Sequence, residues 1–387
     1  MSERFDAVIV GAGITGTSTA YHLMDEGAGR VLLVERGAVA SGGTGKSAAI
    51  IRQHYSTALL ARLTLRGIGM MSAFEAEKPG AFWQSGYMML VPEDLKEKAD
   101  ANLVMQRAAG IDTDWLEGAE ITARAPWLNM DGVAGVVYEP KGGYADPLRV
   151  TERFIERFQT AGGSYRPQTP CRGLVRDGDT ITGVMLESGP ISAAAVVNAA
   201  GPWAKPLADT AGIDMPLRAV REQDSIWQAR GGRPLPTVSI SNAVDAIYLR
   251  PMGDGRFLIG QGFPKEYQDV DPYNYREAAD DEFINLILER AAVRYPPLEG
   301  MTLLSAYAAL YDVTPDWYPF IGPRAGLAGY FDACGGSGHG FKIGPAIGQE
   351  LARWILTGTT SEDFAGLSYD RLAAGKLFAG AYGGNRG

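Results

Sequence analysis

The chain has 387 residues, which is long enough for two packed domains or for one large domain with a substantial insertion. Hydrophobic residues make up 46% of it and charged residues 21%, as in an ordinary soluble globular protein. The net charge of −9 argues against nucleic acid or an anionic membrane surface as the main partner, because both favour clustered Lys and Arg.

The two cysteines, Cys171 and Cys334, do not have the spacing of a disulfide framework or a metal cluster. The N-terminal residues lack a basic stretch followed by a long apolar core, so they do not resemble a secretory signal. No run approaches the ~18 apolar residues that are needed to span a bilayer. These features predict a cytoplasmic protein without a membrane span.

The N-terminal part of the chain predicts a βαβ unit. Residues 5–10 (FDAVIV) form an apolar, β-branched run that ends at a glycine, as a buried parallel strand does. A helix is predicted from about residue 14 to 26, and residues 31–35 (VLLVE) predict a second buried strand. Strand, helix and strand in this order form the unit that binds dinucleotides in many α/β proteins.

The central part of the chain has a different pattern, in which strands separated by turns are interrupted by helices. Strands are predicted at residues 85–92, 133–140, 225–229, 246–250 and 256–260. Helices are predicted at residues 59–77, 95–109 and 282–294. Such a mixture indicates an α+β domain with an antiparallel sheet.

The dinucleotide-binding pattern returns twice. Residues 147–201 begin with a helix and close on a buried strand at 194–198, and residues 329–358 read as strand, glycine-rich turn and helix. The fold class is therefore predicted as α/β plus α+β, with a discontinuous, doubly wound cofactor domain and an inserted domain with a mixed or antiparallel sheet. The predicted cofactor domain consists of residues 1–84, 145–215 and 315–387, and the substrate domain of residues 85–144 and 216–314.

A G-x-G-x-x-G motif joins the first strand to the first helix. Its predicted cofactor contacts are Gly11, Gly13, Ile14, Thr15 and Gly16. The glycines allow a tight turn, close approach of the backbone to a pyrophosphate and close packing of helix on strand. The helix N-terminus supplies free N–H groups and partial positive charge for the phosphates. The alternative is a turn in an α/β protein that binds nothing.

Glu35 ends the second strand and supports a dinucleotide, and the segment after it favours FAD over NAD. Glu35 would accept hydrogen bonds from the adenosine ribose hydroxyls, and its charge would repel a 2′-phosphate. The small residues that follow would let the backbone lie against a flat ligand and extend the site toward a bulky ring, although they would also suit a flexible loop. Further cofactor contacts are predicted at Arg36, Ser41, Thr44, Gly45, Lys46, Ser47 and Ala48. An NAD-dependent dehydrogenase is the alternative enzyme class.

A second glycine-rich segment opens the last long helix. Cofactor contacts are predicted there at Gly336, Gly338, His339, Gly340, Phe341 and Lys342. In a reduced flavin, negative charge collects at N1 and the C2 carbonyl, and an adjacent helix N-terminus favours that charge. A purely structural turn is the alternative.

Five segments resemble the D-amino-acid-oxidase-like family of flavin oxidoreductases in order and spacing: VIVGAGITG, TGKSAAIIRQHY, VVNAAGPWA, YDVTPDWYPFIGP and GGSGHGFKIGPAIG. Within that family the chain is most similar to the branch of sarcosine oxidases, including their β subunits, and dimethylglycine or sarcosine dehydrogenases. The resemblance implies an FAD domain and a substrate domain whose large sheet covers the flavin. It also implies cofactor contacts in the third segment, at Ala200, Gly201 and Trp203.

In that branch, the arginine of an Ile-Ile-Arg motif and the lysine of Gly-His-Gly-Phe-Lys hold the substrate carboxylate, and these residues match Arg52 and Lys342. Two cations in a low-dielectric pocket bind a carboxylate through charge-assisted hydrogen bonds. Alternatively, Arg52 contacts a flavin phosphate or a buried Asp, and Lys342 faces the flavin C2 carbonyl. Tyr248 is a third candidate catalytic residue, on a strand that would cross the substrate side, and Arg250 shares its face. Core packing for Tyr248 and a surface or ion-pair role for Arg250 are the alternatives.

The chain departs from the family pattern in ways that bear on the cofactor. Ala309 occupies the position of the cysteine that attaches flavin in monomeric sarcosine oxidases, and no histidine lies near residues 46–47, so FAD is expected to be non-covalent. The carboxylate-binding arginine of glycine oxidases is absent near residues 310–311, which favours the arrangement of Arg52 and Lys342. Leu258 aligns with the oxygen-activating lysine, so the electron acceptor, O₂ or another, stays open.

The predicted function is FAD-dependent oxidation of the C–N bond of a small secondary or tertiary amine with a carboxylate, such as sarcosine or another N-alkyl or imino acid. Hydride would move to flavin N5 and the imine would hydrolyse. The histidines His54 and His339 are not needed as bases, because hydride transfer from a neutral amine requires none. The alternatives are a flavin-binding β-type subunit that needs a partner chain for turnover, and a D-amino acid or glycine oxidase-like enzyme. A homo- or hetero-oligomer is compatible with each.

Overall fold

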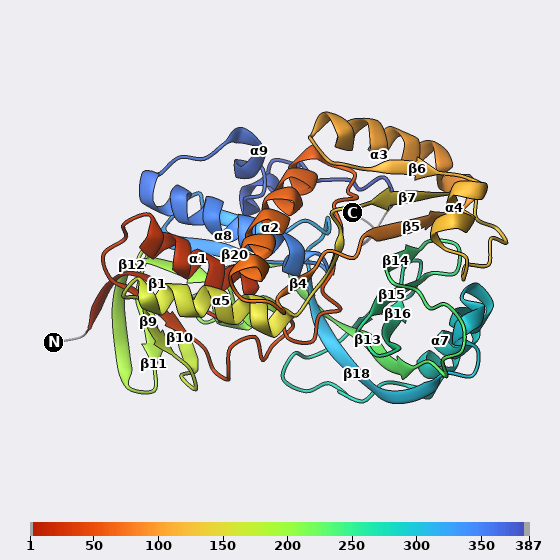
Figure 1. The fold of residues 1–387 in the computed structure, drawn as a ribbon. Coiled ribbons are helices and arrows are strands. Elements are labelled where there is room, and N and C mark those ends of the chain that lie inside the picture. Colours follow the sequence, from red (N-terminus) through yellow and green to blue (C-terminus); the bar gives the residue numbers. More distant parts are fainter. Residues whose placement is uncertain (1–2, 383–387) are drawn as a thin grey trace.

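The structure is a computed structural model that describes residues 3–382. Residues 1–2 and 383–387, which belong to the first and last predicted pieces of the cofactor domain, lie outside this range. Figure 1 shows two parts side by side, each built around its own β-sheet, with β1 and β12 in one part and β13 and β16 in the other. The predicted combination of an α/β part with an α+β part is confirmed, whereas the domain boundaries stay a prediction.

The first part is an eight-stranded sheet with the order β10-β11-β20-β12-β1-β2-β9, to which β19 is added by pairing with β20. Its strands are β1 (Arg4–Val10), β2 (Val31–Val34), β9 (Ser164–Arg166), β10 (Cys171–Asp177), β11 (Thr180–Leu186), β12 (Gly189–Asn198), β19 (Phe320–Arg324) and β20 (Leu327–Cys334). The central pairs β1–β2, β1–β12 and β12–β20 are parallel. Every residue of β2 is buried, as expected for a parallel strand that is covered on both faces.

Three helices lie beside one another on this sheet: α1 (Ile14–Asp25), α5 (Pro147–Thr160) and α8 (Gly340–Thr357) (Figure 1). Helices α1 and α8 approach closely, because a β-carbon at Gly348 would lie only 2.5 Å from Ser18. Gly344 meets Ile14 in the same way, so the two helices run in the same direction. Their N-termini therefore lie together at the carboxyl ends of β1 and β20.

The second part is a nine-stranded mixed sheet with the order β17-β13-β16-β15-β14-β5-β7-β6, in which β18 pairs with β13. Its strands are β5 (Tyr87–Val91), β6 (Asp114–Leu116), β7 (Gly135–Glu139), β13 (Arg218–Gln228), β14 (Ser239–Asn242), β15 (Ile247–Pro251), β16 (Arg256–Gln261), β17 (Gln268–Asp269) and β18 (Thr302–Val313). Helix α7 (Asp281–Arg294) packs Ile287 and Ala291 into the core on the sheet face that carries Leu249 and Ile259. The opposite face of these strands is free to form a site.

Five strands of the second sheet differ from the sequence prediction, because the short strands β6, β14 and β17 were not predicted and the long strands β13 and β18 also depart from it. Strand β13 begins at Arg218 and not at residue 225, and β18, twelve residues long, was not predicted. Both strands carry polar side chains among apolar ones, and Glu222, Asp224 and Tyr311 line a cavity. The strand pattern was weak because these polar positions face a site and not a continuous apolar core.

The described residues also form a third, small sheet and five further α-helices. A three-stranded sheet has the order β3-β8-β4, with β3 (Ile50–Ile51), β4 (Phe82–Trp83) and β8 (Gly143–Ala145). The other helices are α2 (Ala58–Glu77), α3 (Lys96–Ala108), α4 (Ala119–Arg124), α6 (Ala204–Asp209) and α9 (Glu362–Ala365). Within residues 3–382, no helix combines the length and the apolar character that a bilayer crossing requires.

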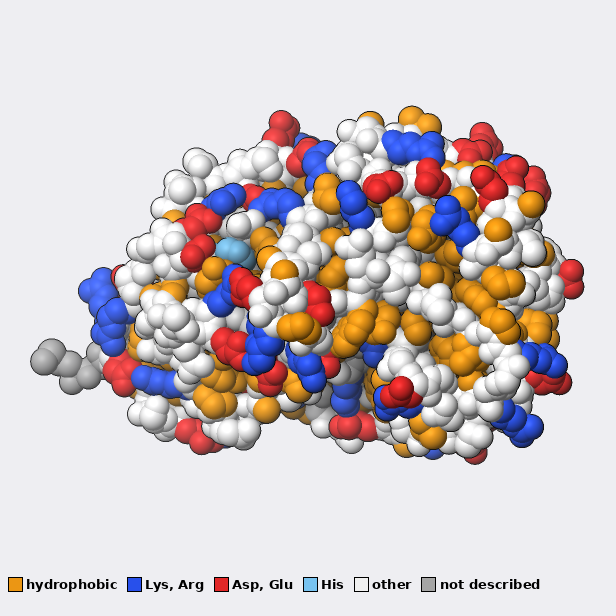
Figure 2. All heavy atoms as spheres, in the orientation of Figure 1, with side chains coloured by type: hydrophobic (Ala, Val, Ile, Leu, Met, Phe, Trp, Pro, Cys, Tyr) orange, Lys and Arg blue, Asp and Glu red, His pale blue; other side chains and the backbone are white. Residues whose placement is uncertain are grey.

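The surface carries charges of both signs. On the face in Figure 2, Lys and Arg side chains are interspersed with Asp and Glu side chains and do not gather into a single patch. Many of these charges form ion pairs at the surface, such as Arg353 with Glu26 at 2.7 Å and Arg62 with Asp363 at 2.6 Å.

Candidate active site

A cavity of about 530 Å³ lies between the two parts of the molecule. Its wall is formed on one side by residues at the carboxyl ends of β1, β2, β12 and β20, and on the other by residues of β13, β15 and β18. Ligands of open parallel sheets bind at the carboxyl ends of the strands. The cavity is therefore in the position that the predicted cofactor site requires.

Most of the residues predicted from the sequence line this cavity. They are Gly11, Gly13, Ile14, Thr15, Glu35, Arg36, Ser41, Thr44, Lys46, Ser47, Ala48, Arg52, Ala200, Gly201, Trp203, Tyr248, Gly336, Gly338, Gly340, Phe341 and Lys342. Three predicted cofactor contacts, Gly16, Gly45 and His339, lie behind the wall. That the lining residues contact a cofactor stays a prediction.

The glycine turn after β1 lies directly against the neighbouring strand. Gly11 has a φ of +109°, and a β-carbon there would collide with the carbonyl oxygen of Ala199. Gly16 packs helix α1 onto the turn in the same way, because its β-carbon would collide with the carbonyl oxygen of Gly11. The N-cap residue Gly13 makes no side-chain capping hydrogen bond, and the first turn of the helix contains no acidic residue. This helix start is suited to an anionic group.

Glu35 fixes the geometry of the turn. One carboxylate oxygen accepts a hydrogen bond from the backbone N–H of Ala12 at 2.8 Å, and the other accepts one from Gly37 N–H, also at 2.8 Å. The hydroxyl oxygen of Thr44 accepts a hydrogen bond from Ile14 N–H at 3.1 Å. Because each carboxylate oxygen can accept more than one hydrogen bond, Glu35 retains capacity for ribose hydroxyls.

Two basic residues of the small-residue segment are held by other side chains. The Lys46 ammonium donates to Glu277 at 2.9 Å and to the Tyr275 hydroxyl at 3.1 Å. The Arg36 guanidinium lies 3.7 Å from the ring centroid of Trp203. The contacts of Lys46 connect the first part of the molecule to the chain between β16 and α7, and Lys46, Arg36 and Trp203 all line the cavity.

The residues present fit FAD. A glycine turn at a helix start suits the pyrophosphate, Glu35 suits the adenosine end, and the cavity continues past them to the second sheet, where a bulky ring system has room. At that far end Gly338 and Tyr311 both line the cavity, and a β-carbon on Gly338 would lie only 2.8 Å from the Tyr311 ring, so the second glycine turn packs closely on β18.

Lys342 stands in the first turn of α8 and faces the cavity. Its side chain is buried, and within residues 3–382 its ammonium has no hydrogen-bond or ion-pair partner. Burial, reinforced by the positive charge of Arg52, holds the pKa of Lys342 well below its usual range. A buried cation without a partner favours an anionic ligand strongly.

Arg52 directly follows β3 and is also buried at the cavity wall. Its guanidinium donates to the carbonyl oxygen of His54 and lies 4.4 Å from the ring centroid of Tyr55. The nearby carboxyl of Glu139 accepts a hydrogen bond from Gln53 N–H at 2.6 Å, and burial raises the pKa of Glu139 to about 7. Arg52 therefore places a positive charge at the cavity wall close to Lys342.

Both histidines near this pair are uncharged at neutral pH. Burial, followed by the charge of Arg52, lowers the pKa of His54 to about 3, and its ring contacts the Tyr382 hydroxyl at 2.9 Å. Burial also holds the pKa of His339 well below its usual range, and its backbone N–H donates to the Gly336 carbonyl at 2.6 Å. The two cations thus remain the source of positive charge at this end of the cavity.

Acidic residues that the sequence did not single out line the opposite wall. The Tyr248 hydroxyl donates to Asp224 at 2.8 Å, and Glu222 lies two residues away on the same strand, paired with Lys265. In the sequence, the feature that could have indicated this wall is the pair of acidic residues at alternate positions of one strand. Arg250 shares the face of Tyr248 as predicted, but it does not line the cavity and donates to the Ala145 carbonyl at 2.9 Å.

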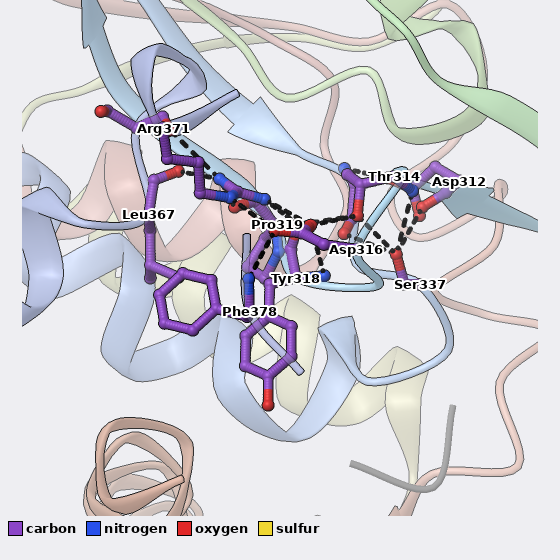
Figure 3. Close-up of polar contacts among 11 residues, drawn as sticks. Asp312, Thr314, Asp316, Tyr318, Pro319, Ser337, Leu367, Arg371 and Phe378 are labelled. Carbon is purple, nitrogen blue, oxygen red and sulfur yellow. Dashed lines mark hydrogen bonds and ion pairs between the residues drawn. The ribbon is translucent and has the colours of Figure 1, made fainter. Parts of the chain in front are cut away.

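The segment YDVTPDWYPFIGP supports the glycine turn before α8 (Figure 3). The Asp312 carboxylate accepts a hydrogen bond from Gly335 N–H at 2.7 Å, and the Ser337 hydroxyl accepts one from Thr314 N–H at 3.2 Å. These bonds hold the two loops together. The position of the turn, and with it that of Lys342, depends on this segment.

A buried ion pair anchors the same segment. The Arg371 guanidinium binds both carboxylate oxygens of Asp316 at 2.8 Å, and it also donates to the carbonyls of Tyr318, Pro319 and Leu367 (Figure 3). Both side chains are almost fully buried. Arg371 was not predicted as important, because it lies 55 residues from Asp316 in the chain.

We expect that Gly11→Ala will abolish FAD binding, because the new β-carbon collides with the Ala199 backbone and the residue has a positive φ. The ratio of absorbance at about 450 nm to that of the protein measures bound FAD. Gly27→Ala is the matched control: φ is +93°, but the β-carbon meets nothing within 4 Å. The control should lose about 1–2 kcal/mol of stability and keep its FAD. Equal FAD content in both variants would contradict this account of the turn.

Known proteins are similar to this chain over most of its length. The family model described as FAD dependent oxidoreductase (DAO) matches residues 6–354. The chain is 29% identical to mitochondrial sarcosine dehydrogenase of Mus musculus, over 94% of this chain and 41% of that protein, and so spans less than half of this relative. It is 26% identical to sarcosine oxidase subunit beta of Arthrobacter sp, over 97% of this chain and 93% of the subunit.

Among solved structures, the crystal structure of L-proline dehydrogenase from P. horikoshii matches with a TM-score of 0.90 and 27% identity, over 98% of this chain and 100% of that chain. The family model covers most of the sequence and includes both glycine turns and the two cations. The resemblance noted in the sequence motifs is thereby confirmed. The chain belongs to the DAO family of FAD-dependent oxidoreductases, and FAD is its cofactor.

Proposed function

We propose that this enzyme oxidises the C–N bond of a small secondary or tertiary amine that carries a carboxylate. The observation that carries the proposal is the buried ammonium of Lys342, which has no partner among residues 3–382 and lies beside Arg52 at the wall of the cofactor cavity. FAD, when bound, supplies the electron acceptor for the hydride that leaves the carbon next to nitrogen.

Arg52 and Lys342 bind the substrate carboxylate. In a buried site, two cations form short, charge-assisted hydrogen bonds to a carboxylate, and the planar guanidinium can bind both of its oxygens. Binding an anion relieves the cost of the buried positive charge of Lys342, which makes the site selective for carboxylates over neutral amines. The same charges lower the pKa of the substrate amine and favour its neutral, reactive form.

The cofactor is held by the residues of the first part of the molecule. The turn at Gly11 and Gly13 would receive the pyrophosphate, Glu35 the adenosine ribose, and the turn at Gly336 and Gly338 the ring system. Trp203 lines the same cavity beside the small-residue segment. These assignments follow from the position of each residue in the cavity wall.

The relatives support a substrate of this class. Sarcosine dehydrogenase and L-proline dehydrogenase are named for substrates in which a secondary amine lies next to a carboxylate. Sarcosine, other N-alkyl glycines and cyclic imino acids all place one carboxylate within reach of a pair of cations. We therefore propose an N-alkyl or imino acid as the substrate, and O₂ or another acceptor for the electrons.

A second candidate is a flavin-binding subunit that turns over only with a partner chain. It is favoured by the match to sarcosine oxidase subunit beta, which covers 93% of that subunit. In this case the isolated chain would bind FAD, and amines would reduce it only after a partner protein is added.

We propose that FAD is held without a covalent bond. Ala309 lines the cavity at the position that corresponds to the flavin-attaching cysteine of monomeric sarcosine oxidases. Cys171 also lies in the cavity wall, but burial raises the pKa of its thiol to about 11, which leaves the thiol unreactive. Precipitation with trichloroacetic acid should release all of the yellow colour into the supernatant. Colour that stays with the protein pellet would contradict this prediction.

Anaerobic mixing with a panel of amines tests the proposed function. Secondary and tertiary amino acids should bleach the absorption of bound FAD near about 450 nm, and primary amino acids should do so more slowly or not at all. Bleaching by NADH alone, or by no member of the panel even with added partner protein, would contradict the proposal.

A further inference from the structure

Asp224 is a buried carboxylate at the cavity wall that no cation pairs. The residue is 7% exposed, and among residues 3–382 it has no salt bridge. One carboxylate oxygen accepts the hydrogen bond of the Tyr248 hydroxyl at 2.8 Å, and no other hydrogen bond to the side chain is found in this range. Both residues line the cavity that contains Arg52 and Lys342.

The strand register explains how this pair faces the cavity. Tyr307, Asp224, Gly260 and Tyr248 stand side by side across the neighbouring strands β18, β13, β16 and β15. Gly260 has no side chain, and a β-carbon there would lie 2.6 Å from the Asp224 carboxylate and would collide with the Tyr248 hydroxyl. The absence of a side chain at Gly260 lets the residues on either side meet above it.

Several ionisable groups surround Asp224: Tyr248 and Arg250 on β15, Glu222 on β13, Lys265 after β16, and Tyr307 and Tyr311 on β18. The two cations among them are engaged elsewhere. Lys265 is bound to Glu222 and to the Gln261 carbonyl at 2.7 Å, and Arg250 donates to the Ala145 carbonyl. Burial raises the pKa of Asp224 to about 6, against the opposing effects of the Tyr248 hydrogen bond and the charge of Lys265.

A carboxylate in this position has two properties that a substrate amine requires. It is ionised at neutral pH, and within the described part of the chain no cation pairs with its buried charge, so it attracts an ammonium group. With a pKa close to neutrality it can also accept a proton, which is what a general base does. The cavity therefore has a cationic wall at Arg52 and Lys342 and an anionic wall at Asp224, as a zwitterionic amino acid demands.

We propose that Asp224, positioned by Tyr248, binds the substrate ammonium and takes its proton before the carbon is oxidised. One N–H bond of the ammonium breaks, its electron pair stays on nitrogen, and an O–H bond forms on Asp224. The neutral amine that results is the form from which hydride leaves, and Asp224 later returns the proton to solvent. This role rests on the proposed oxidation of a carboxylate-bearing amine.

The test is the pH dependence of anaerobic FAD reduction by sarcosine and by L-proline in wild type and Asp224→Asn. The wild-type rate should rise with pH through about pH 6 and then level off, as Asp224 loses its proton. At pH 7 the variant should be slower by about 10²–10⁴-fold, the usual contribution of a general base. As the pH rises above 7, the ratio of the wild-type rate to the variant rate should fall about tenfold per pH unit. It should stop falling near the pKa of the free amine, because the amine then loses its proton to solvent.

The binding of butyrate tests the cationic wall of the cavity independently of Asp224. Butyrate has the shape of sarcosine with CH₂ in place of the amine, and its binding is followed by the change in the flavin absorption spectrum. Asp224→Asn should bind butyrate at least as tightly as wild type, whereas Lys342→Met should bind it more weakly. Asp254→Asn, an exposed carboxylate in the β15–β16 turn, is the matched control and should behave as wild type.

Tyr248→Phe keeps the carboxylate and removes the hydrogen bond that lowers its pKa. The rise in the reduction rate should then move to higher pH, which supplies the test if Asp224→Asn does not retain FAD. If wild type is reduced and Asp224→Asn parallels its profile at every pH, Asp224 is not the proton acceptor. If no amino acid reduces wild type, the proposed function fails and this role with it.

Discussion

Replacing Lys342 with Met is expected to weaken carboxylate binding and to make the protein more stable. A hydrogen bond to a charged group is worth about 1.5–3 kcal/mol, so the affinity for butyrate and kcat/KM for sarcosine should fall by about 10- to 150-fold. The free energy of unfolding should rise, because Met fills the same space without a buried charge that has no partner among the described residues 3–382.

The stability change has a predicted pH dependence. The pKa of Lys342 is lower in the folded than in the unfolded protein, so the cost of burying its charge is largest below the folded-state pKa and disappears above the unfolded one. The advantage of Lys342→Met should therefore shrink as the pH rises toward about 10. Lys205→Met, at an exposed ion pair with Asp209, should change neither property.

An opposite pattern would identify a different role. If Lys342→Met lost FAD while its remaining holoenzyme bound butyrate normally, Lys342 would contact the flavin and not the substrate. If Lys342→Met were less stable than wild type at neutral pH, the ammonium would have a partner in the folded protein. Urea unfolding, butyrate titration and FAD content together distinguish these outcomes.

The second large effect is expected for Arg371→Met. Removing one member of a buried ion pair leaves the other charge uncompensated, which costs about 3–5 kcal/mol. The substitution also removes the hydrogen bonds that Arg371 donates to the carbonyls of Tyr318 and Pro319. The loop before α8 should therefore loosen, and the affinity for FAD should fall. Chemical unfolding of the holoenzyme and titration of the apoenzyme with FAD measure the two effects.

Controls separate the ion pair from general damage. Arg353→Met, which removes an exposed pair with Glu26, should cost at most about 1 kcal/mol. Adding Asp316→Leu to Arg371→Met should recover part of the stability, because it removes the uncompensated carboxylate. The Arg371 guanidinium lowers the pKa of Asp316, so the loss should also diminish as the pH falls and Asp316 takes up a proton. A loss no larger than that of Arg353→Met would contradict this account.

The sequence predicts those parts of the fold that depend on local patterns. The apolar runs that became β1 and β2 and the glycine turn at Gly11 are recognisable because strand, turn and helix follow one another directly. The second glycine turn and α8 are recognisable for the same reason. The family motifs added Arg52 and Lys342, and the structure places both at the wall of one cavity.

Interactions that depend on the register of distant strands were not predictable. The contact of Asp224 with Tyr248 requires β16 to lie between their strands and Gly260 to stand at the same level. The ion pair of Asp316 with Arg371 depends on how the chain after α9 folds back. Conversely, a residue can lie in a recognised segment without lining the cavity. Gly16 and Gly45 were predicted as cofactor contacts, yet they pack against backbone behind the cavity wall. His339, at the N-cap of α8, is likewise structural in position.

The requirement for a carboxylate tests the central claim most directly. Sarcosine and sarcosine methyl ester carry the same secondary amine and differ in the negative charge that Arg52 and Lys342 would bind. Anaerobic mixing with each should give rapid bleaching of bound FAD by sarcosine and a rate at least about tenfold lower with the ester. Equal rates with both compounds would show that the two cations do not hold the substrate, and would contradict the account.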